Sequence, residues 1–269
     1  MILITGASGF VGNKLLESLE DAVAAPSLRG AAKEQIKKII DESNADVVIH
    51  TAAIADTGVC ERNPEESYHA NVLIPMYLAQ CCQGKKLICF SSDQVYNGCD
   101  ETGPYTEGMA KPASVYARHK LEMEQRVLEI LPSAVMLRAE WMYDIHSKKG
   151  NYFLNLLNAE QSVAFGSTIY RGVTYLKEVA ENMEKVISLP GGVYNFGSET
   201  TESIYEITKK FVAFLGKDIS VTDSAYGHNL WMNCEKARHY GVDFSDTLDG
   251  LKRCAEDYKK WGKDTHENI

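Results

Sequence analysis

A tyrosine and a lysine four residues apart, Tyr116 and Lys120, are side chains that can exchange protons. Residues at this spacing lie on the same face of a helix, so the ammonium group would lie beside the phenol. We expect the charge of Lys120 to lower the pKa of Tyr116 from its ordinary value of about 10. Tyr116 could then give or take a proton at a substrate oxygen near neutral pH. His119 should face elsewhere on the helix and be solvated.

A serine-rich segment, Ser91-Ser92-Asp93-Gln94-Val95-Tyr96, precedes this helix and follows the apolar run Leu87–Phe90. The apolar run is typical of a buried strand. Parallel α/β folds carry their reactive groups at the carboxyl ends of strands. Ser92 could therefore hydrogen-bond the same substrate oxygen and polarise it. By itself the tyrosine–lysine spacing is more often a surface pair of a helix, so the interpretation depends on its occurring together with a third motif.

That third motif opens the chain. Met1–Thr5 is typical of a buried strand, and Gly6-x-x-Gly9-x-x-Gly12 follows it directly and begins a helix. A strand that runs into this glycine pattern predicts the phosphate-binding turn of a dinucleotide-binding fold. Gly6 allows the tight turn, Gly9 lets the backbone approach a pyrophosphate, and Gly12 lets the helix pack against the strand. The N–H groups at the helix start then face the phosphates.

Strands and helices alternate over the first part of the chain. This order predicts an α/β fold, a Rossmann-like doubly wound parallel sheet, with a smaller C-terminal α/β lobe for the substrate. We assign residues 1–143 to the NAD(P)-binding domain, to which residues 168–195 return, and residues 144–167 and 196–269 to the lobe. The expected elements are strands at 22–26, 46–50, 87–90, 135–137 and 192–197, and helices at 33–42, 65–82 (kinked at Pro75), 115–131, 152–157, 176–187, 203–216 and 248–261.

Composition narrows the class of protein. The 269 residues carry a net charge of −9, which argues against a nucleic-acid or anionic-membrane surface. No apolar run is long enough to cross a membrane and no signal peptide precedes the first strand, so we expect a cytoplasmic protein. The seven cysteines form no C-x-x-C motif and are expected to be reduced thiols. No cluster of His, Asp or Glu has metal-ligand spacing, so we expect no metal.

The end of the second strand favours NADP over NAD. An NAD-specific fold places an acidic residue there to bind the ribose hydroxyls. This chain has Ser27 and Arg29 instead, and both could contact a 2′-phosphate. A solvated arginine is the alternative reading of Arg29.

Together these motifs resemble the extended short-chain dehydrogenase/reductases, the NAD-dependent epimerase/dehydratase superfamily. Within it the chain is most similar to the dTDP-4-dehydrorhamnose reductase family. Ser91–Tyr96 is similar to that family's S-T-D-Y-V-F, and Leu137–Tyr143 to its L-R-T-S-W-V-Y. The segment between the second strand and Asp46 is short, and Asn233–Leu251 resembles the closing segment of the family. The resemblance spans nearly the whole chain.

The resemblance implies roles for individual residues. Ser92, Tyr116 and Lys120 would be catalytic. NADP or NAD would be bound by Gly6, Ser8, Gly9, Phe10, Val11, Gly12, Ser27, Arg29, Ala52, Ala53, Tyr116 and Lys120. Asp93, Gln94 and Trp141 would border the sugar of a nucleotide-sugar substrate. Arg171 could meet a substrate phosphate, and an ordinary surface arginine is the other reading.

The family also implies an activity, with alternatives. The first is NAD(P)H-dependent reduction of a 4-keto nucleotide sugar, with the proton from Tyr116. An epimerase of the same superfamily stays open, whereas a dehydratase is disfavoured because Gln94 cannot replace the glutamate that transfers its proton. A non-catalytic NAD(P)-binding regulatory subunit is the third reading. This chain departs from the family at Gln94, which replaces a tyrosine, and at Glu140, which replaces a small serine. Relatives often form homodimers through helices that correspond to Glu65–Cys82 and Val115–Leu131.

Overall fold

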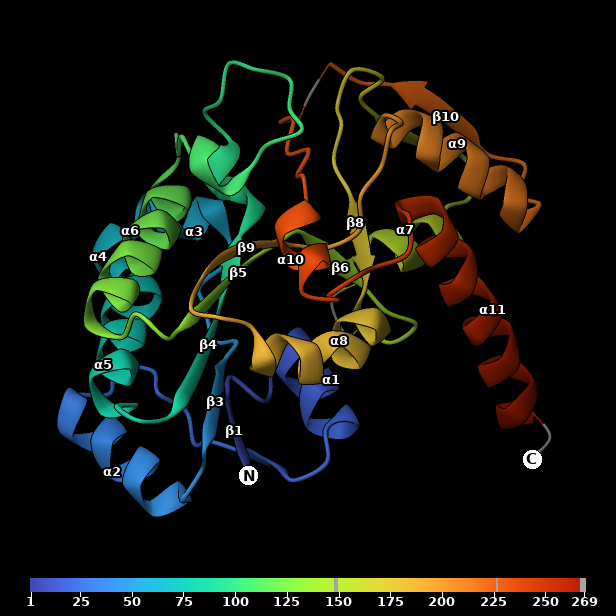
Figure 1. Ribbon diagram of the computed structural model, residues 1–269. Coiled ribbons are helices and arrows are strands. Elements are labelled where there is room, and N and C mark those ends of the chain that lie inside the picture. Colours follow the sequence, from blue (N-terminus) through green and yellow to red (C-terminus); the bar gives the residue numbers. More distant parts are fainter. Residues whose placement is uncertain (148–149, 226, 267–269) are drawn as a thin grey trace.

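A six-stranded parallel sheet organises the computed structural model, which describes residues 1–147, 150–225 and 227–266 (Figure 1). This confirms the predicted α/β fold with a parallel sheet. In spatial order the strands are β2 (Ala22–Ala24), β1 (Ile2–Thr5), β3 (Val47–His50), β4 (Lys86–Ser92), β5 (Val135–Ala139) and β9 (Gly192–Phe196).

Helices cover both faces of this sheet (Figure 1). One face carries α2 (Lys33–Ser43), α5 (Ile74–Cys81) and α6 (Val115–Ile130), and the other carries α1 (Phe10–Ser18) and α8 (Leu176–Ser188). Successive strand residues alternate between the two cores, since Leu3 packs into the first and Ile4 into the second. The strands are therefore apolar on both sides, as a sheet between two helix layers requires.

The strand order places a ligand crevice. The chain leaves β1 toward β2 on one side and then crosses to β3 on the other side. The connections after β1 and β3 diverge there, and folds of this type bind ligands outside the carboxyl ends of such strands. Gly6 and Thr51 follow directly on these two strands.

The helix expected at 65–82 is present from Pro64 to Cys81, but it is not α-helical throughout. The structure has α4 (Pro64–Tyr68), a five-residue π-helical segment at His69–Leu73, and α5. Pro75 lies near the start of α5, directly after the π-helical segment. Such segments are a common site of helix kinks, and the kink expected at Pro75 stays a prediction.

Short strands and helices of the second half form a separate group, at the right of Figure 1. β6 (Trp141–Tyr143) pairs with β8 (Val173–Tyr175), and β7 (Ser162–Phe165) pairs with β10 (Ser220–Asp223). The sequence analysis did not predict these strands, which have only three or four residues each. Helices α7 (Tyr152–Asn158), α9 (Ile204–Leu215) and α11 (Thr247–His266) share an apolar core with them. The domain boundaries stay a prediction.

Local signals set several helix ends. The Ser203 side chain accepts a hydrogen bond from the Glu206 backbone and caps α9, and Gly216 ends it in the left-handed conformation, as expected. The remaining helices are α3 (Thr57–Arg62), α10 (Glu235–His239) and the 3-10 turns Asp93–Tyr96 and Glu107–Met109. Within the described ranges, no helix is both long and apolar enough to cross a membrane. All seven cysteines are free thiols.

Candidate functional site

The glycine motif forms a tight turn between β1 and α1. Gly6 has a φ of +75°, and a Cβ there would lie 2.6 Å from the backbone nitrogen of Ala52. A Cβ at Gly12 would lie 2.3 Å from the Gly6 carbonyl oxygen. Both positions therefore exclude any other residue, as the sequence predicted. The turn is held by a hydrogen bond of 2.9 Å from the Gly9 N–H to the Gly6 carbonyl.

The outer side of this turn is open. A Cβ at Gly9 would meet only the Gly6 oxygen, at 3.1 Å, among described atoms beyond its chain neighbours. Ser8, Gly9 and Phe10 are exposed, and α1 begins at Phe10. Exposed backbone at a helix start is the arrangement that binds phosphate groups. The residues present thus fit a dinucleotide.

The residues proposed for the adenosine end are less clearly arranged. Ser27 and Arg29 are exposed beyond β2, and the Ser27 hydroxyl accepts the Arg29 N–H at 3.3 Å. The Arg29 guanidinium forms an exposed ion pair with Glu66 of α4 at 3.4 Å. Ala52 is half-buried against Gly6, and Ala53 is exposed. A 2′-phosphate would therefore compete with Glu66 for Arg29.

Ser92 ends strand β4 and caps the 3-10 turn that follows. Its hydroxyl accepts the Gln94 N–H at 3.2 Å and donates to Asp93 Oδ1 at 3.1 Å. β4 is longer than expected, since it continues through Ser91 and Ser92. Ser92 and Asp93 are both buried, whereas Gln94 is half-buried.

Tyr116 lies in the first turn of α6, which Ser114 caps, and it is buried. Burial raises the pKa of Tyr116 above its ordinary value, and the nearby Ser92 side chain acts in the opposite direction. The expectation of a pKa lowered by Lys120 is therefore wrong for the chain alone. The Lys120 ammonium lies 5.8 Å from the centre of the Tyr116 ring, and desolvation of the phenol outweighs it.

Lys120 is almost completely buried one turn along the same helix. Its ammonium donates to the Phe90 carbonyl at 2.8 Å, and burial lowers its pKa to about 8. Its charge also contributes, after burial, to lowering the pKa of His50 at the end of β3 to about 3. His50 is thus neutral at physiological pH and pairs with the Thr5 hydroxyl at 2.6 Å. The structure brings Ser92, Tyr116 and Lys120 together.

His119 is not solvated as expected. Its Nδ1 lies 2.8 Å from the Ser67 hydroxyl, and its ring packs edge-on against Tyr68 of α4. His119 therefore links the two helices, because its side of α6 packs against α4.

Arg171 is buried next to Asp93. It donates to Asp93 Oδ2 at 2.9 Å, and its guanidinium lies 3.7 Å from the centre of the Trp141 ring. Arg171 is 6% exposed and Asp93 is 2% exposed, while Trp141 is half exposed. The reading of Arg171 as a surface arginine is therefore wrong. Burial raises the pKa of Asp93, and the charge of Arg171 opposes this effect.

Glu140 extends this cluster from the end of β5. Its Oε1 accepts the Thr174 hydroxyl at 2.5 Å, and Oε2 has no hydrogen-bond partner among described residues. A Cβ at Gly172 or Gly197 would lie within 2.7 Å of this carboxyl group, so both glycines make room for it. Burial raises the pKa of Glu140 to about 8. The sequence analysis noted Glu140 only as a departure. It missed His50, Thr174 and Ser198, whose backbone N–H donates to the Thr174 hydroxyl at 2.8 Å.

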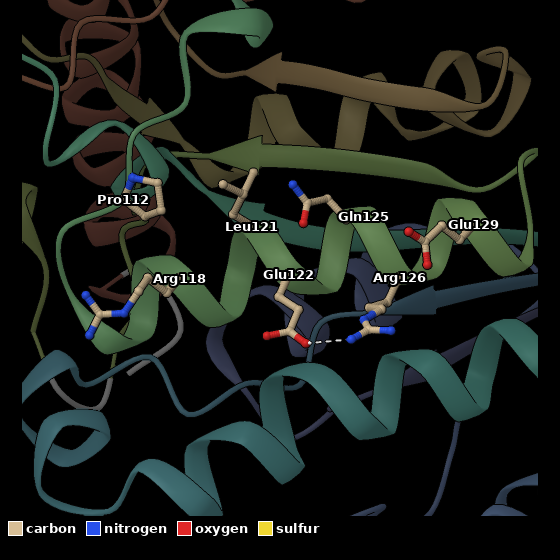
Figure 2. A pocket seen from close by; sticks show the side chains of 7 residues that line it. All are labelled: Pro112, Arg118, Leu121, Glu122, Gln125, Arg126 and Glu129. Atoms are coloured by element: carbon tan, nitrogen blue, oxygen red, sulfur yellow. Dashed lines mark hydrogen bonds and ion pairs between the residues drawn. The ribbon is translucent and has the colours of Figure 1, made fainter.

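A surface hollow lies elsewhere, on the outer face of α6 (Figure 2). Tyr116, Lys120 and Glu124 are on the buried face of the same helix. The hollow therefore faces away from the cluster around Ser92. Its lining residues are Pro112, Arg118, Leu121, Glu122, Gln125, Arg126 and Glu129.

Comparisons with known proteins show what the chain is similar to. Residues 1–227 match the family model of the RmlD substrate binding domain. The spore coat polysaccharide biosynthesis protein SpsK of Bacillus subtilis is 26% identical over 243 residues, 84% of each chain. A dTDP-4-dehydrorhamnose reductase of Aggregatibacter actinomycetemcomitans is 28% identical over 76% of each chain. The crystal structure of dTDP-4-dehydrorhamnose reductase from Bacillus anthracis in complex with NADP has a TM-score of 0.82 at 22% identity, covering 95% of this chain and 97% of that one.

Proposed function

The chain belongs to the RmlD substrate binding domain family of extended short-chain dehydrogenase/reductases, and from this premise we propose that it is an NAD(P)H-dependent reductase of a 4-keto nucleotide sugar. The relatives named dTDP-4-dehydrorhamnose reductase support the substrate class, and the complex of one structural neighbour with NADP supports the cofactor. The observation that carries the proposal is the grouping of Ser92, Tyr116 and Lys120 at the carboxyl end of β4.

Tyr116 is the proposed proton donor. Because burial raises its pKa, the phenol is protonated at neutral pH and can give its proton to the keto oxygen. The ammonium of Lys120, 5.8 Å from the ring centre, would stabilise the phenolate that remains. A bound nicotinamide would supply the hydride to the keto carbon, so that ketone, hydride and proton give the alcohol.

Ser92 would orient the reacting oxygen, and the turn Gly6–Gly12 would hold the pyrophosphate. NADP stays the favoured cofactor because Ser27 and Arg29 follow β2 where an NAD-specific fold has an acidic residue. Asp93, Gln94 and Trp141 would border the sugar. An epimerase would use the same Ser92, Tyr116 and Lys120, and a regulatory subunit would use none of them. A homodimer, in the cytoplasm, stays a prediction.

Cofactor binding followed by turnover tests the proposal. NADPH and NADH are titrated into the purified chain by fluorescence, and a panel of 4-keto nucleotide sugars is then added while the reduced nicotinamide band is recorded. Oxidation with one sugar supports the reductase. Isomerisation of a sugar without net oxidation would identify an epimerase. Tight cofactor binding with no reaction, together with co-purification of a second chain, would identify a regulatory subunit.

Replacement of Tyr116 tests the proton donor. Tyr116→Phe should lower turnover by at least about a hundredfold, because the keto oxygen loses its acid, and should leave NADPH affinity nearly unchanged. Tyr77→Phe, on α5, is the matched control and should keep full activity, because Tyr77 packs against the apolar core of the sheet. If the activity of Tyr116→Phe stays within tenfold of the parent, Tyr116 is not the proton donor.

A further inference from the structure

A continuous series of hydrogen bonds joins the segment after β3 to helix α6. Asn71, in the π-helical segment, brackets the backbone of Ile54, because its Oδ1 accepts the Ile54 N–H at 3.2 Å and its Nδ2 donates to the Ile54 carbonyl at 3.0 Å. Nδ2 also donates to the Ser67 hydroxyl at 3.2 Å, which lies 2.8 Å from Nδ1 of His119. Ser67 and Asn71 are each 1% exposed. We call these four residues the His119 network.

The protons of the His119 network have one arrangement that pairs every donor. The Ile54 N–H can only donate and the Ile54 carbonyl can only accept, so they fix which end of the Asn71 amide is the oxygen. The two Asn71 N–H groups then go to Ile54 and Ser67, since the Cys60 sulfur is farther away, at 4.0 Å. Ser67 accepts from Asn71, so its own proton goes to Nδ1 of His119, its other partner among the described residues. This assignment makes His119 neutral, with its proton on Nε2.

Ile54 ends a short segment that lies against the glycine turn. At the other end of the segment, the N–H and the hydroxyl of Thr51 donate to the carbonyl of the last β1 residue, at 3.1 and 2.9 Å. A Cβ at Gly6 would lie only 2.6 Å from the Ala52 nitrogen, so this backbone is in close contact with the turn. The segment Ala52–Ile54 is therefore held by β1 at one end and by the His119 network at the other. A shift of Ile54 would move backbone that packs on the proposed pyrophosphate site.

Side chains from three helices face the His119 imidazole. Tyr68 of α4 packs edge-on against the ring, and its hydroxyl donates to Glu122 of α6 at 3.0 Å. Burial lowers the pKa of His119, and the charge of Arg118 acts in the same direction. The carboxylates of Glu122 and of Glu61, on α3, oppose this effect. The imidazole is therefore neutral at physiological pH, as the hydrogen bond at Nδ1 requires, and acid would charge it.

We propose that His119 is a positioning residue for the cofactor, which accepts the Ser67 proton and thereby keeps the segment Ala52–Ile54 fixed against the glycine turn. Without this acceptor, the Ser67 proton has only the Asn71 amide among its described partners. The amide would have to turn its oxygen toward Ser67 to accept that proton, and it would then give up both bonds to Ile54. The inference rests on the proposed binding of NADPH at the glycine turn.

Affinity for NADPH tests the positioning role. His119→Phe keeps a ring against Tyr68 and removes the acceptor, so we expect the Kd of NADPH to rise at least about threefold, within the worth of one hydrogen bond. His119→Asn, whose amide oxygen can take the place of Nδ1, should stay within about twofold of the parent. His239→Phe is the matched control and should bind as the parent does, because His239 also packs edge-on against a tyrosine but is exposed on α10. A His119→Phe variant that loses stability and keeps its NADPH affinity would overturn the proposal.

A double-mutant cycle tests whether His119 acts through Ser67. In Ser67→Ala no hydroxyl proton competes for Asn71, so adding His119→Phe should leave the Kd within about 1.5-fold. The same loss in both backgrounds would overturn the proposal. Acid gives a second test, because a protonated imidazole cannot accept a hydrogen bond and the parent should then lose its advantage over His119→Phe. An advantage that persists after His119 is protonated would also overturn it.

Hydrogen exchange of two backbone amides makes the test independent of the cofactor. In His119→Phe the Ile54 N–H should exchange at least about threefold faster than in the parent, whereas the Thr51 N–H, which bonds β1, should not change. In Ser67→Ala the Ile54 amide should stay protected with or without His119→Phe. Unchanged exchange at Ile54, or equal acceleration at both amides, would overturn the inference in favour of a merely structural role. If exchange behaves as expected and the parent binds no NADPH, the His119 network holds the segment and the proposed cofactor site fails.

Discussion

Two buried arginine–carboxylate pairs lie near the carboxyl ends of β4 and β5, and they differ in how completely they are bonded. Arg138 of β5 bonds Glu124 of α6 through Nε at 3.0 Å and through a terminal nitrogen at 2.7 Å. Its other terminal nitrogen bonds the Tyr96 hydroxyl and the Glu107 carbonyl. The Ser91 hydroxyl donates a further hydrogen bond to the Glu124 carboxylate at 2.6 Å. Every nitrogen of this guanidinium has a partner.

The pair of Arg171 with Asp93 is incomplete by comparison. It has one hydrogen bond, and Arg171 Nε, Glu140 Oε2 and Ser198 Oγ lack partners within the described part of the chain. Buried polar groups are nearly always bonded, so unbonded ones need a reason, and a ligand is one. A complete network fixes the packing of α6 on the sheet, whereas an incomplete one costs stability and suits a site that changes partners. The difference indicates that Arg138 stabilises the fold and that Arg171 belongs to a functional site.

The largest effect should come from breaking the complete pair. Arg138→Met leaves Glu124 buried without its counter-charge and should lower the free energy of unfolding by about 3 to 5 kcal/mol. Urea unfolding at neutral pH measures this loss. Arg126→Met breaks an exposed pair with Glu122 on the same helix and should change stability by less than about 1 kcal/mol. A loss below about 1 kcal/mol for Arg138→Met would contradict the structural reading.

Removing the Glu140 carboxylate from the incomplete cluster should stabilise the protein, whereas Arg138→Met destabilises it. Burial raises the pKa of Glu140 from 4.5 to about 8. A raised carboxyl pKa means that the folded state holds a proton that the unfolded state has lost. The contribution of Glu140 to the free energy of unfolding is therefore fully present below pH 4.5, and it is lost as the pH rises through about 8. Glu140→Gln should be more stable than the parent by about 1 to 3 kcal/mol at pH 8, and the two should be equally stable near pH 4.5.

Unfolding by urea at a series of pH values measures this difference. The stability of the parent should fall across the interval relative to the variant, and the two curves should converge at acid pH. Glu129→Gln, on the outer face of α6, is the control and should follow the parent at every pH. A Glu140→Gln variant less stable than the parent at pH 8 would mean that the carboxylate is well compensated, and the two clusters would then not differ.

The sequence predicted the elements that local patterns determine. Alternating apolar strands and periodic helices predicted the sheet. The spacing of Gly6 and Gly12 predicted a tight turn, and a Cβ added at Gly12 would lie only 2.3 Å from the Gly6 oxygen. Tyr116 and Lys120 share a helix face because their spacing requires it. Their nearness to Ser92 followed from the order of the elements and the rule that reactive groups lie at strand ends.

The two ion pairs could not be predicted in the same way. Arg171 and Asp93 are 78 residues apart, and Glu124 and Arg138 belong to different layers. The contact of Arg171 depends on how β8, which follows it, lies against β6, and these strands are too short to leave a periodic pattern. The contact of Glu124 with Arg138 depends on how α6 packs on β5. The pKa of Tyr116 was expected with the wrong sign because spacing shows the neighbouring charge and does not show the burial, which outweighs it.

The smallest effect should come from Trp141, which stacks on Arg171 at 3.7 Å and is half exposed. Trp141→Leu should cost about 0.5 to 1 kcal/mol of stability, because it removes a cation–π contact near the surface. The same substitution in the Arg171→Met background should cost clearly less, since no cation remains to stack, and urea unfolding of the four proteins gives the coupling. Equal costs in both backgrounds would show that Trp141 only fills space. Coupling would instead show that the incomplete cluster depends on stacking to hold its arginine, whereas every guanidinium nitrogen of the complete one has a hydrogen bond.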